Sequence, residues 1–111
     1  MTDTDTVSPR VLVVVPTYNE RENLPVLAHG VLSHPGYRML VVDDNSPDGT
    51  GRVADQLAAD YPGRVMVVHR TGARGLGRSY VDGLLRAVAM EDVDLICQMD
   101  ADFSHDPADL R

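Results

Sequence analysis

Residues 95–102 read Leu-Ile-Cys-Gln-Met-Asp-Ala-Asp, an apolar run that ends in two carboxylates separated by one small residue. The run is typical of a strand buried in a parallel sheet. Ligand sites in such sheets lie just beyond the carboxyl ends of the strands. Side chains at positions i and i+2 of an extended segment point the same way, so Asp100 and Asp102 can reach one cation. The stretch therefore predicts a site for Mg²⁺ or Mn²⁺, with nucleotide phosphates as the usual companion ligand.

The rest of the chain alternates strand-like and helix-like segments, which predicts an α/β fold with a mostly parallel sheet and flanking helices. Apolar runs mark four strands, at residues 11–15, 39–42, 65–68 and 94–99. Apolar residues at helical spacing mark three helices, at about residues 23–32, 50–61 and 80–88. We expect Asn23 and Thr50 to cap the first two helices. Residues 107–111 resemble the opening of a further helix.

Length and charge narrow the class of protein. The 111 residues suffice for one domain, and the net charge of −7 argues against a nucleic-acid partner. The single cysteine, Cys97, excludes an internal disulfide, and we expect it to be a buried, inert thiol. No apolar run approaches the roughly 20 residues of a membrane span. Residues 1–9 are polar, typical of a disordered tail rather than a signal peptide, so a cytoplasmic location is expected.

Polar segments follow three of the predicted strands: Pro-Thr-Tyr-Asn-Glu at 16–20, Asp-Asp-Asn at 43–45 and Asp-Ala-Asp at 100–102. The carboxyl ends of parallel strands share one edge of the sheet, so the three segments are expected to converge. Clustered carboxylates repel one another and resist burial without a cation. A nucleotide with its metal explains the cluster better than a solvated rim, although Asp43 and Asp44 alone also fit a solvated turn.

A rival motif lies at residues 72–79, Gly-Ala-Arg-Gly-Leu-Gly-Arg-Ser, which has the spacing of a phosphate-binding P-loop. Arg78 stands where a P-loop has lysine, and a planar guanidinium does not replace a compact ammonium. A P-loop here would also leave residues 16–20 without a role. The segment is then either a flexible basic connection or a mobile flap in which Arg70, Arg74 or Arg78 meets phosphate.

Four segments, at residues 13–24, 41–50, 75–77 and 99–105, closely resemble the polyprenol (dolichol) phosphate mannosyltransferases. These are inverting family 2 glycosyltransferases with a GT-A (Rossmann-like) fold. The resemblance runs from about Val11 to Arg111 and covers the first half of that family's catalytic domain. It implies that residues 10–111 are the amino-terminal, nucleotide-sugar-binding part of a GT-A domain.

The resemblance also implies a reaction, the inverting transfer of mannose from GDP-mannose to a polyprenyl phosphate with Mg²⁺ or Mn²⁺. The metal would offset charge on the departing GDP, and catalysis would rest on positioning and electrostatic stabilisation. The enzyme would lie on the cytoplasmic face of the membrane, through parts beyond this chain. The implied pocket for base and ribose comprises Pro16, Tyr18, Glu20, Val42 and Asp44. The implied contacts with diphosphate and sugar are Asp100, Ala101 and Asp102, of which Asp100 and Asp102 hold the metal.

Several alternatives stay open at this point. Some relatives carry glutamine as a metal ligand where this chain has Ser104, so His105 or water could complete the site. The donor could be a UDP-sugar, as in related family 2 transferases. The chain could also be a nucleotide-binding fragment without catalytic activity.

Overall fold

The structure, a computed structural model, describes residues 10–71 and 76–101. The expected tail at 1–9, the expected helix at 107–111, and Asp102, Ser104 and His105 lie outside the described residues. The elements follow one another as β1 (Val11–Thr17), α1 (Asn23–Leu32), β2 (Tyr37–Asp43), α2 (Thr50–Asp60), β3 (Val65–His69), α3 (Leu76–Val88) and β4 (Leu95–Gln98). The predicted α/β alternation is confirmed.

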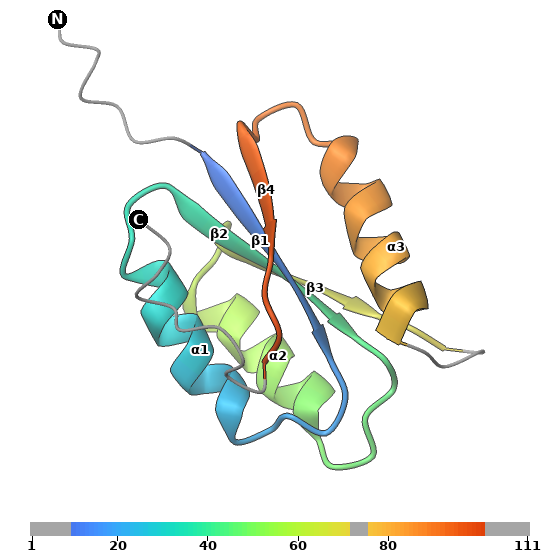
Figure 1. Ribbon diagram of the computed structural model, residues 1–111. Coiled ribbons are helices and arrows are strands. Elements are labelled where there is room, and N and C mark those ends of the chain that lie inside the picture. Colours follow the sequence, from blue (N-terminus) through green and yellow to red (C-terminus); the bar gives the residue numbers. More distant parts are fainter. Residues whose placement is uncertain (1–9, 72–75, 102–111) are drawn as a thin grey trace, which may run out of the picture.

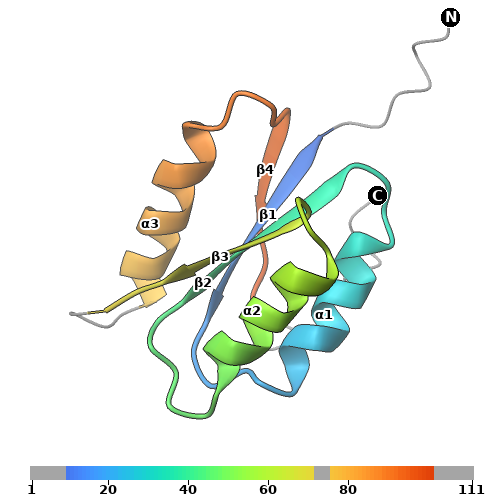
Figure 2. The same cartoon turned by 180° about the vertical axis from the view of Figure 1, so that it is seen from behind.

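The four strands form one parallel sheet in the order β3-β2-β1-β4 (Figure 1). Helices α1 and α2 cover one face, and α3 covers the other, as the view from behind also shows (Figure 2). Because all strands run the same way, their carboxyl ends share one edge of the sheet, which we call the carboxyl edge. No helix in the described part of the chain is long and apolar enough to cross a membrane.

Strand residues alternate between the two helical layers, as the pleat requires. The core on the α1–α2 face takes odd-numbered strand residues, among them Val11, Val13, Val15, Met39 and Val41. The core on the α3 face takes even-numbered ones, namely Leu12, Val14, Leu40 and Val42, together with Ala87 of α3. The same alternation decides which layer each side chain at the carboxyl edge meets.

Helix α3 lies close to the sheet at Gly83. A Cβ on this glycine would clash with Val14 Cγ1 and lie 3.2 Å from Val42 Cγ2. The absence of a side chain at Gly83 therefore sets the distance between α3 and the two central strands. The residues just before Gly83, Tyr80 and Asp82, bond to groups at the carboxyl edge.

Several element boundaries differ from the sequence-based expectation. Strand β1 continues through Pro16 and Thr17. The backbone carbonyl of Val14 points toward β4, where it accepts a hydrogen bond from the N–H of Met99. The backbone of Pro16, two residues further along β1, therefore also points toward β4. The β1–β4 pairing ends at Val14 and Gln98, and the missing N–H of Pro16 costs no ladder bond there.

The fourth strand is not buried, in contrast to the expectation. Leu95 is 55% exposed, and Cys97 is only partly buried. Strand β4 pairs with β1 alone, and the described residues place no strand on its other side. Among the described residues β4 thus has a neighbouring strand on one side only, which accounts for its partial exposure.

The two expected helix caps are also wrong. Glu22 and Gly49 occupy the N-cap positions, and Asn23 and Thr50 are the first helical residues. The backbone N–H of Thr50 instead donates to Asp48 Oδ1 at 2.9 Å. The third helix begins at Leu76, four residues before its expected start.

Candidate functional site

Asp43 closes β2 on the α1–α2 face and is 2% exposed. Its Oδ1 accepts hydrogen bonds from the hydroxyls of Thr17 (2.8 Å) and Ser46 (2.6 Å), and its Oδ2 accepts the Ser46 N–H (3.0 Å). The Ser46 hydroxyl oxygen also accepts the N–H of Asn19 at 3.0 Å. Asp43 is thus a buried structural acid that joins the loops after β1 and β2, and not part of a solvated turn.

A second network joins the loop after β1 to the start of α2. The N–H of Glu20 donates to the Thr50 hydroxyl oxygen at 2.9 Å, and the Thr50 hydroxyl donates to Asp48. The N–H of Arg21 donates to Asp48 Oδ2 at 3.3 Å. The Thr50 hydroxyl is the main reason that the pKa of Asp48 lies below its ordinary value, because hydrogen bonds to the carboxylate favour its charged form.

Two asparagines turn the chain where these loops leave the sheet. Asn19 and Asn45 have φ angles of 57° and 58°, in the left-handed region that asparagine adopts more readily than most residues. Each asparagine lies two residues past the end of its strand, so both turns begin at the carboxyl edge.

Asp44 lies on the α3 face, one residue after Asp43, and is 5% exposed. Arg70, which follows β3, donates from Nη1 to Asp44 Oδ1 at 2.7 Å and from Nε to Asp82 Oδ2 of α3 at 2.6 Å. The Arg70 side chain is 10% exposed. Arg70 is therefore partly buried and held between two carboxylates, whereas Arg78 is exposed and Arg74 lies outside the described residues.

Asp100 follows β4 and is bonded from the same helix. The hydroxyl of Tyr80 on α3 donates a hydrogen bond to Asp100 Oδ1. The neighbouring Ala101 is 2% exposed and packs in the core of the α1–α2 face, so its contribution to a ligand site would come from its backbone. Asp100 thus bonds to α3 directly and Asp44 is linked to it through Arg70, although β1 separates their strands.

The remaining residues implied by the resemblance lie around this edge. Tyr18 is 38% exposed, and Glu20 is partly buried, with its Oε2 accepting a hydrogen bond from Asn23 Nδ2 at 3.1 Å. Pro16 is buried in β1. Val42 is fully buried, so its contribution would be to hold the Asp43–Asp44 strand end in place.

Metal binding can be judged from the donor chemistry. No group of three or more His, Cys, Asp or Glu side chains that could hold a metal lies within residues 10–71 and 76–101. Asp100 supplies carboxylate oxygens at the carboxyl edge, which is the chemistry that Mg²⁺ and Mn²⁺ take. Asp102, the second expected ligand, lies outside the described residues. The donor type present fits a hard divalent cation.

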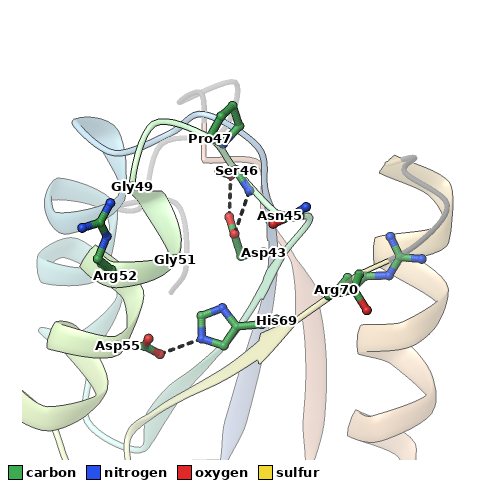
Figure 3. Close-up of a pocket in the computed structure, with 11 residues that line it drawn as sticks. Asp43, Asn45, Ser46, Pro47, Gly49, Gly51, Arg52, Asp55, His69 and Arg70 are labelled. Carbon is green, nitrogen blue, oxygen red and sulfur yellow. Dashed lines mark hydrogen bonds and ion pairs between the residues drawn. The ribbon is translucent and has the colours of Figure 1, made fainter.

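A pocket of about 230 Å³ lies beside this edge, over α2 and β3 (Figure 3). Asp43, Ser46, His69 and Asp55 are among its lining residues, and Arg70 also lines it but extends toward α3 (Figure 3). His69 Nε2 and Asp55 Oδ1 lie 2.8 Å apart. Both side chains are about half exposed, so this is a surface pair of small energetic weight.

The sequence reasoning gave no role to His69, Asp55 or Asp82. His69 pairs in register with Asp43, on the α1–α2 face, and the next residue, Arg70, meets the α3 face. Side chains alternate between the two faces of a strand, and this alternation can be continued for two residues past the strand end. It would have predicted the face on which His69 lies and the face on which Arg70 lies.

A parallel α/β sheet whose polar loops gather at the carboxyl edge is the architecture of nucleotide-binding domains. Comparison with known proteins identifies the family. Residues 12–111 match the model of glycosyl transferase family 2, and the chain belongs to this family.

Curated relatives agree with this assignment. The chain is 49% identical over 112 residues to the polyprenol monophosphomannose synthase of Mycolicibacterium smegmatis, covering 97% of this chain and 42% of that protein. It is 50% identical to the undecaprenyl-phosphate mannosyltransferase of Micrococcus luteus (91% of this chain, 41% of the relative). The dolichol-phosphate mannosyltransferase of Pyrococcus furiosus is 41% identical (88% and 27%). The chain thus spans about two-fifths of the length of the first two relatives.

Solved structures share the fold. The mannosyltransferase PcManGT from Pyrobaculum calidifontis, in complex with GDP-Man and Mn²⁺, superposes with a TM-score of 0.68 at 28% identity, over 87% of this chain and 28% of that one. Staphylococcus aureus TarS superposes with a TM-score of 0.58 at 24% identity, over 84% and 27%. The first neighbour shows that a relative with this fold binds a nucleotide sugar with a divalent metal.

Proposed function

We propose that this chain is the donor-binding part of a mannosyltransferase that moves mannose from GDP-mannose to a polyprenyl phosphate with inversion. The observation that carries the proposal is that two acids at one edge of the sheet are linked to α3: Asp100 bonds directly to Tyr80, and Asp44 bonds to Arg70, which in turn bonds to Asp82. The names of the curated relatives support the acceptor, and the structural neighbour with GDP-Man and Mn²⁺ supports the donor.

The arrangement at the edge suits the two ends of a nucleotide sugar. Tyr18, at 38% exposure, offers a ring for contact with the base, with Pro16 and Glu20 beside it. Asp44, held by Arg70, is assigned to the ribose side. Asp100, Ala101 and Asp102 are assigned to the diphosphate and sugar, on the strand two places away from β2.

Mg²⁺ or Mn²⁺ would be held by Asp100 and Asp102, and would neutralise charge on the diphosphate leaving group. The chain's own residues bind and orient the donor. A lipid phosphate is ionised near neutral pH and attacks without a strong protein base, so positioning supplies much of the rate. A lipid acceptor also implies that the enzyme works at a membrane surface, which we propose to be the cytoplasmic face.

The test is a calorimetric titration of GDP-mannose, with and without Mn²⁺, on this chain and on Asp102→Ala. The proposal predicts Mn²⁺-dependent binding that Asp102→Ala abolishes and that UDP-glucose and UDP-N-acetylglucosamine do not compete for. Asp55→Ala is the matched control, because it removes a carboxylate from the neighbouring pocket, and it should bind as the wild type does.

Two results would count against this assignment. If UDP-sugars competed with GDP-mannose at equal concentration, the chain would instead belong to a transferase of this family that uses a UDP-sugar as donor. A folded chain that binds no nucleotide sugar, and that gains no binding when lengthened to the full extent of its relatives, would refute the donor site.

A further inference from the structure

We infer that Tyr80 is a positioning residue for Asp100, so that α3 orients the carboxylate assigned to the metal and diphosphate. The inference rests on the proposed function for the role of Asp100. It adds a role for Tyr80, a residue of α3 that lies 20 positions before Asp100 in the chain.

The packing of α3 against the sheet fixes the position of Tyr80 relative to Asp100. Gly83 lies against Val14 and Val42 with no room for a side chain, so the helix has one close approach to the central strands. Tyr80 lies one helical turn before Gly83, and residues three apart share a helix face. A tyrosine at this place can extend past β1 to the end of β4.

The second anchor of α3 lies on the other side of the sheet centre. Asp82 accepts a 2.6 Å hydrogen bond from Arg70 Nε, and Arg70 also holds Asp44. One helix therefore contacts the groups that follow β3 and β4, on opposite sides of β2 and β1. Its lateral position is fixed by both contacts, which limits the directions that the Tyr80 hydroxyl can take.

The hydrogen bond itself leaves the carboxylate able to bind a cation. A carboxylate has two oxygens with about four lone-pair sites, and Tyr80 uses one of them on Oδ1. Groups that donate a hydrogen bond to a metal-binding side chain fix the orientation of that side chain. Their loss typically lowers metal affinity about 10- to 100-fold. Tyr80 donates such a hydrogen bond to Asp100.

The experiment compares Tyr80→Phe with wild type, using Mn²⁺ as the probe. Electron paramagnetic resonance measures Mn²⁺ binding to the protein alone, and calorimetry measures GDP-mannose binding across a series of Mn²⁺ concentrations. Tyr61→Phe is the matched control, because it removes the same hydroxyl from the C-cap of α2. Thermal unfolding establishes that each variant is folded.

We expect Tyr80→Phe to need about 10- to 100-fold more Mn²⁺ for half-maximal binding, with unchanged GDP-mannose affinity at saturating Mn²⁺. Tyr61→Phe should match wild type in both measurements. A general loss of structure would weaken binding at every Mn²⁺ concentration, so the shift of the Mn²⁺ midpoint alone marks a positioning role.

A folded Tyr80→Phe with the wild-type Mn²⁺ midpoint would overturn the inference and leave the donor site standing. Mn²⁺ binding without any GDP-mannose binding, both by this chain and by one lengthened to the full extent of its relatives, would refute the proposed function, while the Tyr80→Phe comparison on Mn²⁺ alone would still decide the role of Tyr80. A wild-type protein that binds no Mn²⁺, at this length and at the full length of its relatives, would overturn both.

If Tyr80→Phe does not fold, the wild-type protein still provides a test. The Cζ resonance of Tyr80 should shift on titration with Mg²⁺, with the same midpoint as metal-dependent nucleotide binding. A resonance that does not respond to the metal would contradict the inference.

Discussion

The hydroxyl of Thr17, at the end of β1, donates a 2.8 Å hydrogen bond to Asp43 Oδ1 at the end of β2. The two side chains are 3% and 2% exposed. A carboxylate buried to this degree needs donors, and Thr17 and Ser46 supply them. The bond ties together the two loops from which Tyr18, Glu20 and Asp44 extend, so the shape of the proposed donor pocket depends on it.

Thr17→Val should destabilise the fold by about 1–3 kcal/mol, because it removes one donor from a buried carboxylate and keeps the side-chain volume. Urea unfolding followed by circular dichroism measures the change. Thr71→Val is the control, since Thr71 is exposed, and it should cost less than about 0.5 kcal/mol. Equal stability of the two variants would mean that the Thr17 bond contributes nothing.

Arg70→Met should cost about 3–5 kcal/mol, because it leaves the buried Asp44 carboxylate without its guanidinium partner. Adding Asp44→Asn removes the stranded charge, so the double variant should recover part of the loss. The comparison is made by denaturant unfolding at pH 7. A double variant less stable than Arg70→Met alone would contradict this account of the pair.

Gly83→Ala tests the close contact of α3 with the sheet. Helix propensity alone favours alanine by about 1 kcal/mol. The added Cβ would clash with Val14 Cγ1, so a net loss of about 1–3 kcal/mol is expected. Leu85→Ala is the control on the exposed side of the helix, where Leu85 is 63% exposed, and its effect should be small. A stabilising Gly83→Ala would show that the helix stands further from the sheet.

Asp48 gives the fold a defined pH dependence. The Thr50 hydroxyl lowers the pKa of Asp48 below its ordinary value of 3.8, so the charged carboxylate stabilises the folded state. That contribution is fully present above pH 3.8 and is lost as the pH falls through the lowered pKa. Asp48→Asn should therefore melt below wild type at pH 7, with a difference that shrinks below pH 3.8.

Thermal unfolding between pH 7 and pH 2.5 measures this difference. The destabilisation should persist at high salt, because a hydrogen bond rather than a distant charge is its main cause. A difference between Asp48→Asn and wild type that stays constant across this pH range would rule out the ionised carboxylate as the source.

The parallel sheet and its polar edge could be predicted from the sequence, because strand-like and helix-like segments alternate and acids follow the strands. The different surroundings of adjacent acids could not be read from composition. Asp43 and Asp44 are chemically identical neighbours, yet the pleat turns one toward Thr17 and the other toward Arg70. Alternation along the strand contains that information once the helical layers are known.

Hydrogen-bond partners far apart in the sequence could not be predicted, for a different reason. The bonds of Arg70 to Asp82 and of Tyr80 to Asp100 depend on where α3 crosses the sheet, and Gly83 sets that crossing. A mid-helix glycine in sequence does not specify its partner strand. The partial exposure of β4 was missed as well, since an apolar run does not specify how many strands lie beside it.

The central claim is that the donor binds at the carboxyl edge on the α3 side, and nuclear magnetic resonance tests it most directly. Amide signals are recorded with GDP-mannose and Mg²⁺, and small amounts of Mn²⁺ are then added to broaden signals near the metal. The account predicts selective broadening at Asp100, Ala101 and Tyr80, with Arg38 and Arg64 at the opposite end of the sheet unaffected. Broadening centred on Arg38 and Arg64, or none despite bound GDP-mannose, would contradict it.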